Sequence, residues 1–372
     1  MNKVRFAVDL GTTNIEICLV DNRGYILSSV SFQNRQALYG SDVINRIYTV
    51  ARDKSYLAIM RDMAITDLKR NFQNMLDEAG YKAYEVDIIC ISGNTTMNSI
   101  LLSYDITTLG IAPFKTPSKE SVFLEADALF DDMFSADTKV IFFGCASAFI
   151  GGDILSGMYF LKHNEEYVFS DNGVSLFVDM GTNGEIVLCN NGIYTATSTA
   201  CGPAFEGCTR KQQVYGCSTI DAISMGINAG KIDRNGTLQD QYLDTGIDIM
   251  KVHITKDIIE QILSAKSAIY TGILSLINHS GLKLEDVEQV YIAGGFGFYL
   301  NNESAVNIGL LPEVFIDKIH TLGNTSLKGA CRILNEINIP LEIDTYDIEV
   351  LELANDEFFK SNLIENMTFA RK

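Results

Sequence analysis

The stretch Val8-Asp9-Leu10-Gly11-Thr12-Thr13-Asn14 returns in the second half of the chain as Val178-Asp179-Met180-Gly181-Thr182-Asn183-Gly184. Each copy lies between two short apolar runs, and the second run ends in a tight-turn cluster, at residues 21–24 or 190–192. This order predicts a strand, a glycine turn, a strand and a second turn, twice over. A glycine turn lets an anion approach backbone N–H groups, and a neighbouring aspartate can hold a divalent cation. The repeat therefore predicts two hairpins that bind a nucleotide triphosphate and its metal ion.

A second motif is also found twice, as Ser92-Gly93-Asn94-Thr95-Thr96-Met97 and as Leu322-Gly323-Asn324-Thr325-Ser326-Leu327. Gly-Asn-Thr before a helical pattern provides a helix cap and allows close backbone approach. Two motifs repeated in the same order indicate a duplicated domain, and 372 residues suit two domains. We expect a first domain over residues 1–172, a second over 173–350, and a C-terminal helix within 351–372 that packs back on the first domain.

Further helices are predicted from apolar spacing. The pattern favours helices over residues 56–79, 257–278 and 352–367. Residues 291–297, Tyr-Ile-Ala-Gly-Gly-Phe-Gly, read as a strand followed by a glycine-rich turn, which suits either contact with a nucleoside or tight packing.

The charge and hydrophobicity of the sequence limit the kinds of molecule that this protein is expected to bind. The formal net charge is −18, which argues against nucleic acid or an anionic membrane surface as the main partner. The longest uncharged apolar runs are too short to span a membrane. The chain enters a strand directly after Met1, without a signal-peptide pattern. We therefore expect a cytoplasmic protein.

The eight cysteines do not form a recognisable metal or cluster motif. Most lie in apolar stretches and are expected to be small core residues. Cys201, Cys208 and Cys217 gather in a glycine-rich segment, but their spacing matches no common zinc or iron–sulfur pattern, and their role stays open. The four histidines show no paired ligand spacing. The sequence therefore predicts no zinc site and no iron–sulfur cluster in this chain.

Taken together, the ordered motifs resemble the actin/Hsp70/sugar-kinase superfamily of ATPases. This resemblance implies an α/β fold of duplicated, ribonuclease H-like domains that face each other across a nucleotide cleft. It also implies that Asp9 and Asp179 hold Mg²⁺ and position the attacking water. The residues that would cradle the phosphates of ATP are Gly11, Thr12, Thr13, Asn14, Gly181, Thr182 and Asn183. Those that would border the adenosine are Gly294, Gly295 and Phe296.

Finer segments narrow the resemblance to one family. Residues 39–47, 149–153, 200–207, 308–312 and 351–354 together resemble the ATP-dependent reductive activators of corrinoid proteins. This resemblance implies ATP-driven reduction of Co(II) to Co(I) in a corrinoid protein, and a homodimer is a further expectation. Such activators usually carry an iron–sulfur domain, but no Cys-x₄-Cys-x₂-Cys run is present in this sequence. We therefore expect a separate ferredoxin-like protein to supply the electron.

Several residues have two interpretations. Asp153 could act as a catalytic base or help to hold the metal ion, or it could cap the helix that follows. Glu206 could face the cleft or close a turn. Lys266 could touch the nucleotide or lie on a solvated helix face. Asp42 and Arg46 stand four residues apart on one predicted helix, which favours an ion pair over a docking role.

Two other functions use the same nucleotide-binding motifs. The chain could be a kinase for a small acid or sugar, although the sequence reveals no acceptor pocket. It could also be a non-catalytic, ATP-dependent regulatory module, an alternative that the missing iron–sulfur motif strengthens. Phosphorylated product would distinguish the kinase, and partner reduction without hydrolysis would distinguish the module.

Overall fold

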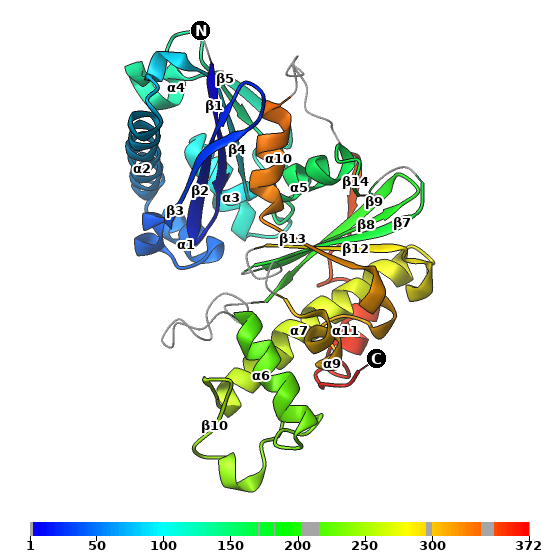
Figure 1. Cartoon of the computed structure of the whole chain (residues 1–372). Coiled ribbons are helices and arrows are strands. Elements are labelled where there is room, and N and C mark those ends of the chain that lie inside the picture. Colours follow the sequence, from blue (N-terminus) through cyan, green and yellow to red (C-terminus); the bar gives the residue numbers. More distant parts are fainter. Residues whose placement is uncertain are drawn as a thin grey trace. The chain divides into compact units, whose positions relative to one another are not determined.

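The computed structural model describes residues 3–167, 169, 172–181, 183–201, 216–294, 300–335 and 346–371. The chain forms two compact units (Figure 1). The first unit contains Met1–Tyr167 and Thr325–Asp347, and the second contains Val168–Asn324 and Ile348–Lys372. Each unit is built on a six-stranded sheet with helices, so the predicted α/β class is confirmed.

The sheet of the first unit has the strand order β3-β2-β1-β4-β6-β5. β1 pairs antiparallel with β2, and β2 with β3, whereas β4 and β6 continue the sheet in parallel from β1. β5 closes the far edge antiparallel to β6. The strands are β1 (Val4–Leu10), β2 (Asn14–Asp21), β3 (Ile26–Gln33), β4 (Val86–Gly93), β5 (Val122–Glu125) and β6 (Lys139–Phe142).

The sheet of the second unit repeats this plan in the order β13-β12-β7-β8-β9-β14. β7, β8 and β9 form the antiparallel meander, and β12 and β13 extend it in parallel from β7. Five strands of each sheet share one order, which confirms the predicted duplication. The sixth strand differs, because β5 pairs antiparallel with β6 whereas β14 pairs in parallel with β9 at the opposite edge. The strands are β7 (Val174–Met180), β8 (Asn183–Asn190), β9 (Ile193–Ala200), β12 (Gln289–Ala293), β13 (Ile319–Gly323) and β14 (Ile348–Val350), and a separate hairpin joins β10 (Ile247–Ile249) to β11 (Val252–Ile254).

In the first unit, alternate residues of a strand face opposite sides of the sheet, and helices pack on both sides. The even-numbered residues of β1, from Val4 to Leu10, join the core under α2, while Ala7 joins a second cluster under α5 and α10. Period-two alternation therefore sends Asp9 to the same face as Ala7. The helices of this unit are α1 (Val43–Arg52), α2 (Ser55–Ala79), α3 (Thr95–Leu101), α4 (Asp127–Phe130), α5 (Gly152–Lys162) and α10 (Thr325–Leu334).

The second unit buries the isoleucine-rich face of a long helix, α7 (Lys256–His279). Thr255 caps this helix by accepting the N–H of Ile258. The other helices are α6 (Gly216–Asn228), α9 (Asn302–Asn307) and α11 (Glu357–Leu363). The predicted helices over 56–79 and 257–278 are thus confirmed, whereas the terminal one is shorter than expected because its cap is Asp356.

Two expectations about the domains are wrong. Residues 325–347 belong to the first unit, although the motif that opens them was assigned to the second domain. The C-terminal segment belongs to the second unit rather than packing on the first. Its apolar anchor, Phe369, is fully buried in the second core, and Ser267 on α7 donates to the carbonyl of Leu363. Within the described ranges, no helix combines the length and apolar character needed to cross a membrane.

Candidate functional site

The turn between β1 and β2 is held by its carbonyl groups. Asn34 Nδ2 donates to the carbonyl of Gly11 at 2.9 Å, and the Asn34 N–H donates to that of Thr13 at 2.8 Å. Arg46 Nη2 donates to the carbonyl of Thr12 at 2.6 Å. Asn94 Nδ2 reaches the hydroxyl of Thr12 at 2.8 Å. Asn94 also caps α3 by accepting the N–H of Met97, as the Gly-Asn-Thr motif predicts.

This arrangement orients the peptide groups of the turn. In a trans peptide the N–H points opposite to the carbonyl of the preceding residue. With the carbonyls of Gly11 and Thr12 bound to Asn34 and Arg46, the N–H groups of Thr12 and Thr13 point the other way. A pair of oriented N–H groups at a glycine turn is a typical anion-binding arrangement.

Arg46 was not expected in this role. Its side chain is fully buried, and it also donates to the carbonyl of Gly40 at 3.0 Å and to Gln36 Oε1 at 3.1 Å. Burial lowers the pKa of Arg46 to about 10, so it keeps its charge at neutral pH. Asp42 instead caps α1 by accepting the N–H of Asn45 at 2.9 Å. The expected surface pairing of Asp42 with Arg46 is therefore wrong.

Asp9 lies near the end of β1, on the face that α5 and α10 cover. Ser326 Oγ, in the first turn of α10, donates to Asp9 Oδ1 at 2.7 Å. Ser326 Oγ also shares a hydrogen bond of 2.8 Å with Ser92 Oγ, and Ser92 stands beside Asp9 on β4. The carboxylate that was predicted from the first repeat is thus oriented by a residue of the last one.

Asp153 lies in the first turn of α5, close to Asp9. Burial, and then the charge of Asp9, raise the pKa of Asp153 to about 7. The cap of α5 is Gly151, but the Asp153 carboxylate also accepts the N–H of Ile154 at 2.9 Å. Asp153 therefore lies inside the first turn rather than at the cap of α5, so the capping alternative is wrong. Its role as a base or in holding the metal ion stays a prediction.

Each hairpin contains a second acidic residue that the sequence reasoning missed. Glu16 on β2 stands directly opposite Asp9, and Glu185 on β8 stands directly opposite Asp179. Opposed residues of an antiparallel pair share a face, and like charges there are unfavourable unless something offsets them. The signal was available, since both repeats continue from the glycine turn into a strand that carries a glutamate.

In the second unit, the described part of the repeat has the same local form. The N–H of Gly181 donates to the carbonyl of Asn183 at 2.9 Å, which closes the turn after β7. Gly294 directly follows β12 with φ at +88°, and a Cβ there would come within 2.9 Å of Asp179 Oδ1. Close approach of the backbone to Asp179 therefore requires glycine at this position. Four predicted site residues, Thr182, Glu206, Gly295 and Phe296, lie outside the described residues.

Two other expectations concern buried side chains of the second unit. Lys266 is buried rather than on a solvated face, and its Nζ donates to the carbonyl of Gly309 at 3.3 Å. Its predicted contact with a nucleotide stays a prediction. Cys201 is buried, and burial raises the pKa of its thiol to about 12, which is typical of an unreactive core cysteine. Cys208 and the side chain of Cys217 lie outside the described residues.

The carboxylates of the first unit suit Mg²⁺, which needs few protein ligands, better than a metal ion whose ligands all come from the protein. No group of three or more His, Cys, Asp or Glu side chains among the described residues is arranged to hold a metal ion. Mg²⁺ commonly uses one or two carboxylates and takes its other ligands from waters and substrate phosphates. The proximity of Asp9 and Asp153, which raises the pKa of the latter, is a repulsion that such a cation would relieve.

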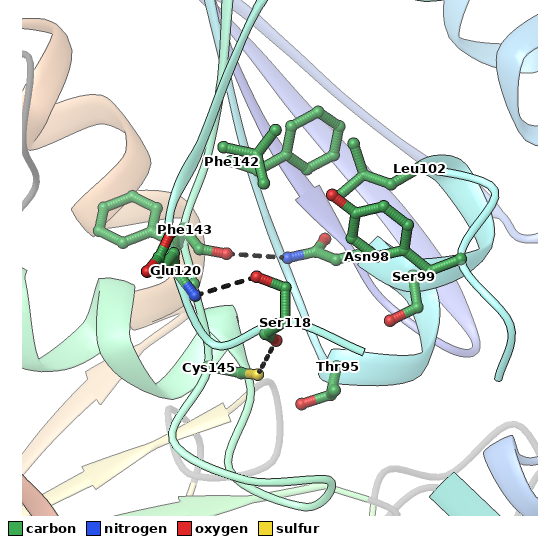
Figure 2. A pocket seen from close by; sticks show the side chains of 12 residues that line it. Thr95, Asn98, Ser99, Leu102, Ser118, Glu120, Phe142, Phe143 and Cys145 are labelled. Atoms are coloured by element: carbon green, nitrogen blue, oxygen red, sulfur yellow. Dashed lines mark hydrogen bonds between the residues drawn. The ribbon is translucent and has the colours of Figure 1, made fainter. Parts of the chain in front are cut away.

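A small pocket of the first unit lies apart from these residues (Figure 2). Asn98 Nδ2 donates to the carbonyl of Phe143 at 3.2 Å, and Cys145 Sγ contacts the carbonyl of Ser118 at 3.2 Å. The first bond fixes α3 against the segment that follows β6, and the second joins that segment to the loop before β5. The pocket is lined by Thr95, Asn98, Ser99, Leu102, Tyr104, Ser118, Glu120, Val122, Phe142, Phe143, Gly144 and Cys145, none of them a predicted site residue.

Two family models match this chain. The model of the RACo middle region matches residues 4–166, and the model of the C-terminal domain of RACo, the ASKHA domain, matches residues 173–214 and 208–372. The chain belongs to the RACo family. The RACo-family regions thus cover both units and both copies of the glycine-turn motif.

Relatives of this RACo-family chain include proteins named for corrinoid activation. Corrinoid activation enzyme RamQ of Eubacterium limosum is 27% identical over 98% of this chain and 70% of that protein. A [Co(II) methylated amine-specific corrinoid protein] reductase of Methanosarcina barkeri is 24% identical over 89% of this chain and 69% of that protein.

A solved structure carries the same fold. The reductive activator for corrinoid,iron-sulfur protein superposes with a TM-score of 0.85 and 26% identity, over 99% of this chain. The match covers 66% of that protein, so this chain spans about two thirds of its length. The actin-like, ASKHA-type fold predicted from the motifs is confirmed.

Proposed function

We propose that this chain binds and hydrolyses ATP to support the reductive activation of a corrinoid protein, from Co(II) to Co(I). The observation that carries the proposal is membership of the RACo family across both units. The relatives named as a corrinoid activation enzyme and a corrinoid-protein reductase support the same reaction class. Both relatives are longer than the region that matches this chain, so the proposal rests on the region that they share with it.

Nucleotide binding is assigned first to the turn after β1. The N–H groups of Thr12 and Thr13 are oriented for phosphate oxygens, because Asn34 and Arg46 hold the carbonyls on the other side. Asp9, with Asp153 nearby, would hold Mg²⁺, and when bound this ion neutralises charge that develops on the phosphates. By the duplication, Asp179, Gly181 and Asn183 would contribute in the same way from the second unit.

ATP must change the relative affinity for the two cobalt states, because a ligand shifts an equilibrium only through differential binding. We propose that a separate ferredoxin-like iron–sulfur protein supplies the electron. In this scheme the chain supplies a nucleotide-dependent conformation that favours the reduced corrinoid, and the iron–sulfur protein supplies the reducing equivalent.

The test is the appearance of Co(I) absorbance when ATP is added to the chain, a corrinoid protein and a low-potential reductant. We expect reduction that depends on ATP and that is lost in Asp9→Ala. Asp62→Ala is the matched control, because the Asp62 side chain is 73% exposed on α2. Absence of any effect of ATP would contradict the proposal.

The same assay separates the competing functions. A kinase would transfer phosphate to an added acid or sugar rather than release free phosphate in response to the corrinoid protein. A regulatory module would still support corrinoid reduction after Asp9→Ala had abolished hydrolysis. Either result would replace the proposed ATPase function.

A further inference from the structure

Ser92 stands where three segments of the first unit meet. It lies on β4 beside Asp9 of β1, in the parallel pairing of the two strands. The face of the sheet that carries both side chains is covered by α5 and α10, which lie side by side in Figure 1. Ser92 is fully buried, so its hydroxyl has to find its hydrogen-bond partners inside the protein.

The Ser92 hydroxyl reaches both of these helices. Its Oγ lies 2.8 Å from Ser326 Oγ in the first turn of α10, and 3.1 Å from the carbonyl oxygen of Gly152, the first residue of α5. Ser326 Oγ in turn donates to Asp9 Oδ1 at 2.7 Å. A serine hydroxyl has a single proton. Because Ser326 gives its proton to Asp9, Ser92 is the donor in the bond between the two hydroxyls, and its proton is shared between α10 and α5.

The direction of these bonds affects the carboxylate of Asp9. A hydroxyl that accepts one hydrogen bond becomes a better donor in the next, because successive bonds polarise one another. Ser92 therefore fixes the rotation of the Ser326 hydroxyl and strengthens its bond to Asp9. The same proton also holds the first turn of α5, which carries Asp153. One buried hydroxyl thus links the two elements that flank Asp9.

The second copy of the motif shows that the fold itself does not need a hydroxyl at this position. Where the first copy has Ser92 before Gly93, the second has Leu322 before Gly323. Leu322 is buried in β13, and that strand also leads through its glycine into a helix. Either side chain therefore suits the strand, glycine and helix of the repeat, so the serine requires an explanation specific to its own partners.

We propose that Ser92 is a positioning residue for Asp9, which acts through Ser326 and ties α5 and α10 to the same carboxylate. This inference rests on the proposed function, because Asp9 is the residue assigned to Mg²⁺ there. The glycine turn that would hold the phosphates has other supports, from Asn34 and Arg46. Loss of the Ser92 hydroxyl should therefore lower the rate of hydrolysis more than it weakens the binding of nucleotide.

The experiment compares Ser92→Ala, Ser326→Ala and the double variant by phosphate release from ATP with the full-length chain. We expect Ser92→Ala to lower kcat about fivefold, with KM within about twofold of wild type. Because Ser92 acts through Ser326, the double variant should be about as slow as Ser326→Ala alone. Ser92→Thr keeps the hydroxyl and should recover part of the rate. Ser92→Cys, a weaker donor of similar size, serves if Ser92→Ala fails to fold.

Thr138→Val is the matched control. Thr138 is fully buried, and its Oγ1 donates at 2.8 Å to the carbonyl of Val86, at the other end of β4. This variant loses a comparable buried bond of the same strand and should keep the wild-type kcat. The proposal is overturned by an unchanged kcat in Ser92→Ala, by an equal loss in Thr138→Val, or by a double variant slowed by the product of the two single effects.

A second measurement needs no nucleotide. In the ligand-free chain, amide hydrogen exchange in the N-terminal halves of both α5 and α10 should be at least about threefold faster in Ser92→Ala than in Thr138→Val. A wild-type chain that hydrolyses no ATP would contradict the proposed function alone. Exchange then decides on Ser92, because unchanged exchange in the two helices would overturn its bridging role.

Discussion

Arg46 carries a positive charge into the interior of the first unit, beside the turn that is proposed to bind phosphate. Its guanidinium group donates to the carbonyls of Gly40 and Thr12 and to the side chain of Gln36. A planar group with several fixed donors can bridge acceptors that a lysine ammonium would reach only in part. One side chain thereby holds the turn, the segment before α1 and the helix itself in one arrangement.

Replacement of Arg46 by Met tests this role. The change leaves three buried acceptors without their donor, so we expect the free energy of unfolding to fall by about 2–4 kcal/mol. ATP affinity, measured by calorimetry, should fall about tenfold because the Thr12 carbonyl is released. Arg52→Met, at an exposed position of the same helix, should change either quantity little. Unaltered ATP binding in Arg46→Met would show that the turn does not need this support.

Asp153 predicts a pH dependence of stability in the metal-free protein. Its pKa is raised from 3.8 to about 7 by burial and by Asp9, so between these values the folded state holds a proton that the unfolded state has released. The unfolding free energy should therefore fall as pH rises from about 4 to about 7 and level off above.

Asp153→Asn removes this titration. The free energy of unfolding is measured by denaturant unfolding in a buffer that contains a metal chelator. Between pH 5 and pH 8 it should fall by roughly 1–3 kcal/mol less in the variant than in the wild type. Added Mg²⁺ should restore part of the wild-type stability at pH 8. Asp62→Asn, on the exposed face of α2, should keep the wild-type pH profile. Identical profiles for wild type and Asp153→Asn would contradict the assigned environment.

At the scale of elements, the contact of α10 with α5 organises the site. Gly329 lies against α5 so closely that a Cβ there would come within 1.9 Å of the Ser156 carbonyl. Ser156 Oγ in turn donates to the carbonyl of Ser326 at 2.8 Å. The first turn of α10 is thereby held over the end of β1, where Ser326 meets Asp9.

Ser326→Ala tests whether α10 orients Asp9. Loss of one hydrogen bond to a partly buried carboxylate should slow ATP hydrolysis about tenfold with a smaller change in KM, measured as phosphate release. Ser326→Thr, which keeps the hydroxyl, should recover part of the rate. Ser156→Ala removes a bond of the same helix pair without touching Asp9, and should retain most of the activity. Equal losses in Ser156→Ala and Ser326→Ala would indicate helix packing rather than orientation of Asp9.

At the scale of the whole molecule, each unit is assembled from segments distant in sequence. The C-terminal segment completes the second unit: Arg234 Nη1 donates to the carbonyl of Phe369 at 2.6 Å, and the Phe369 N–H donates to the carbonyl of Arg234 at 2.7 Å. Asn366 Nδ2 reaches the hydroxyl of Thr271 at 3.0 Å. The last residues of the chain are therefore part of the second core.

Phe369→Ala should accordingly affect only one unit. Truncation of a fully buried phenylalanine costs about 3–5 kcal/mol, and we expect faster amide hydrogen exchange in β7, β8 and α7 but not in β1 or β4. Met367→Ala, at a position 38% exposed, is the control and should leave exchange near wild type. Loss of protection in β1 and β4 would instead support the packing on the first domain that was expected from the sequence.

The amino-acid sequence alone determined the two hairpins, the duplication and the α/β class, because these depend on short-range patterns. A glycine turn between apolar runs and a helix after Gly-Asn-Thr are local features of the chain. Their repetition can be read directly from the amino-acid sequence. The predicted position of Asp9 at the end of a strand was correct for the same reason, as were the long helices α2 and α7.

Tertiary structure decided which elements complete each unit and which side chains support the turn. The bonds of Asn34 and Arg46 to the turn, and the bond of Ser326 to Asp9, join residues far apart in the sequence, where neither spacing nor propensity carries a signal. Burial also contradicted the expected surface pairing of Arg46 and the solvated alternative for Lys266, because burial depends on what packs above a residue. The hairpins were set by local backbone chemistry, whereas the oriented site required long-range packing.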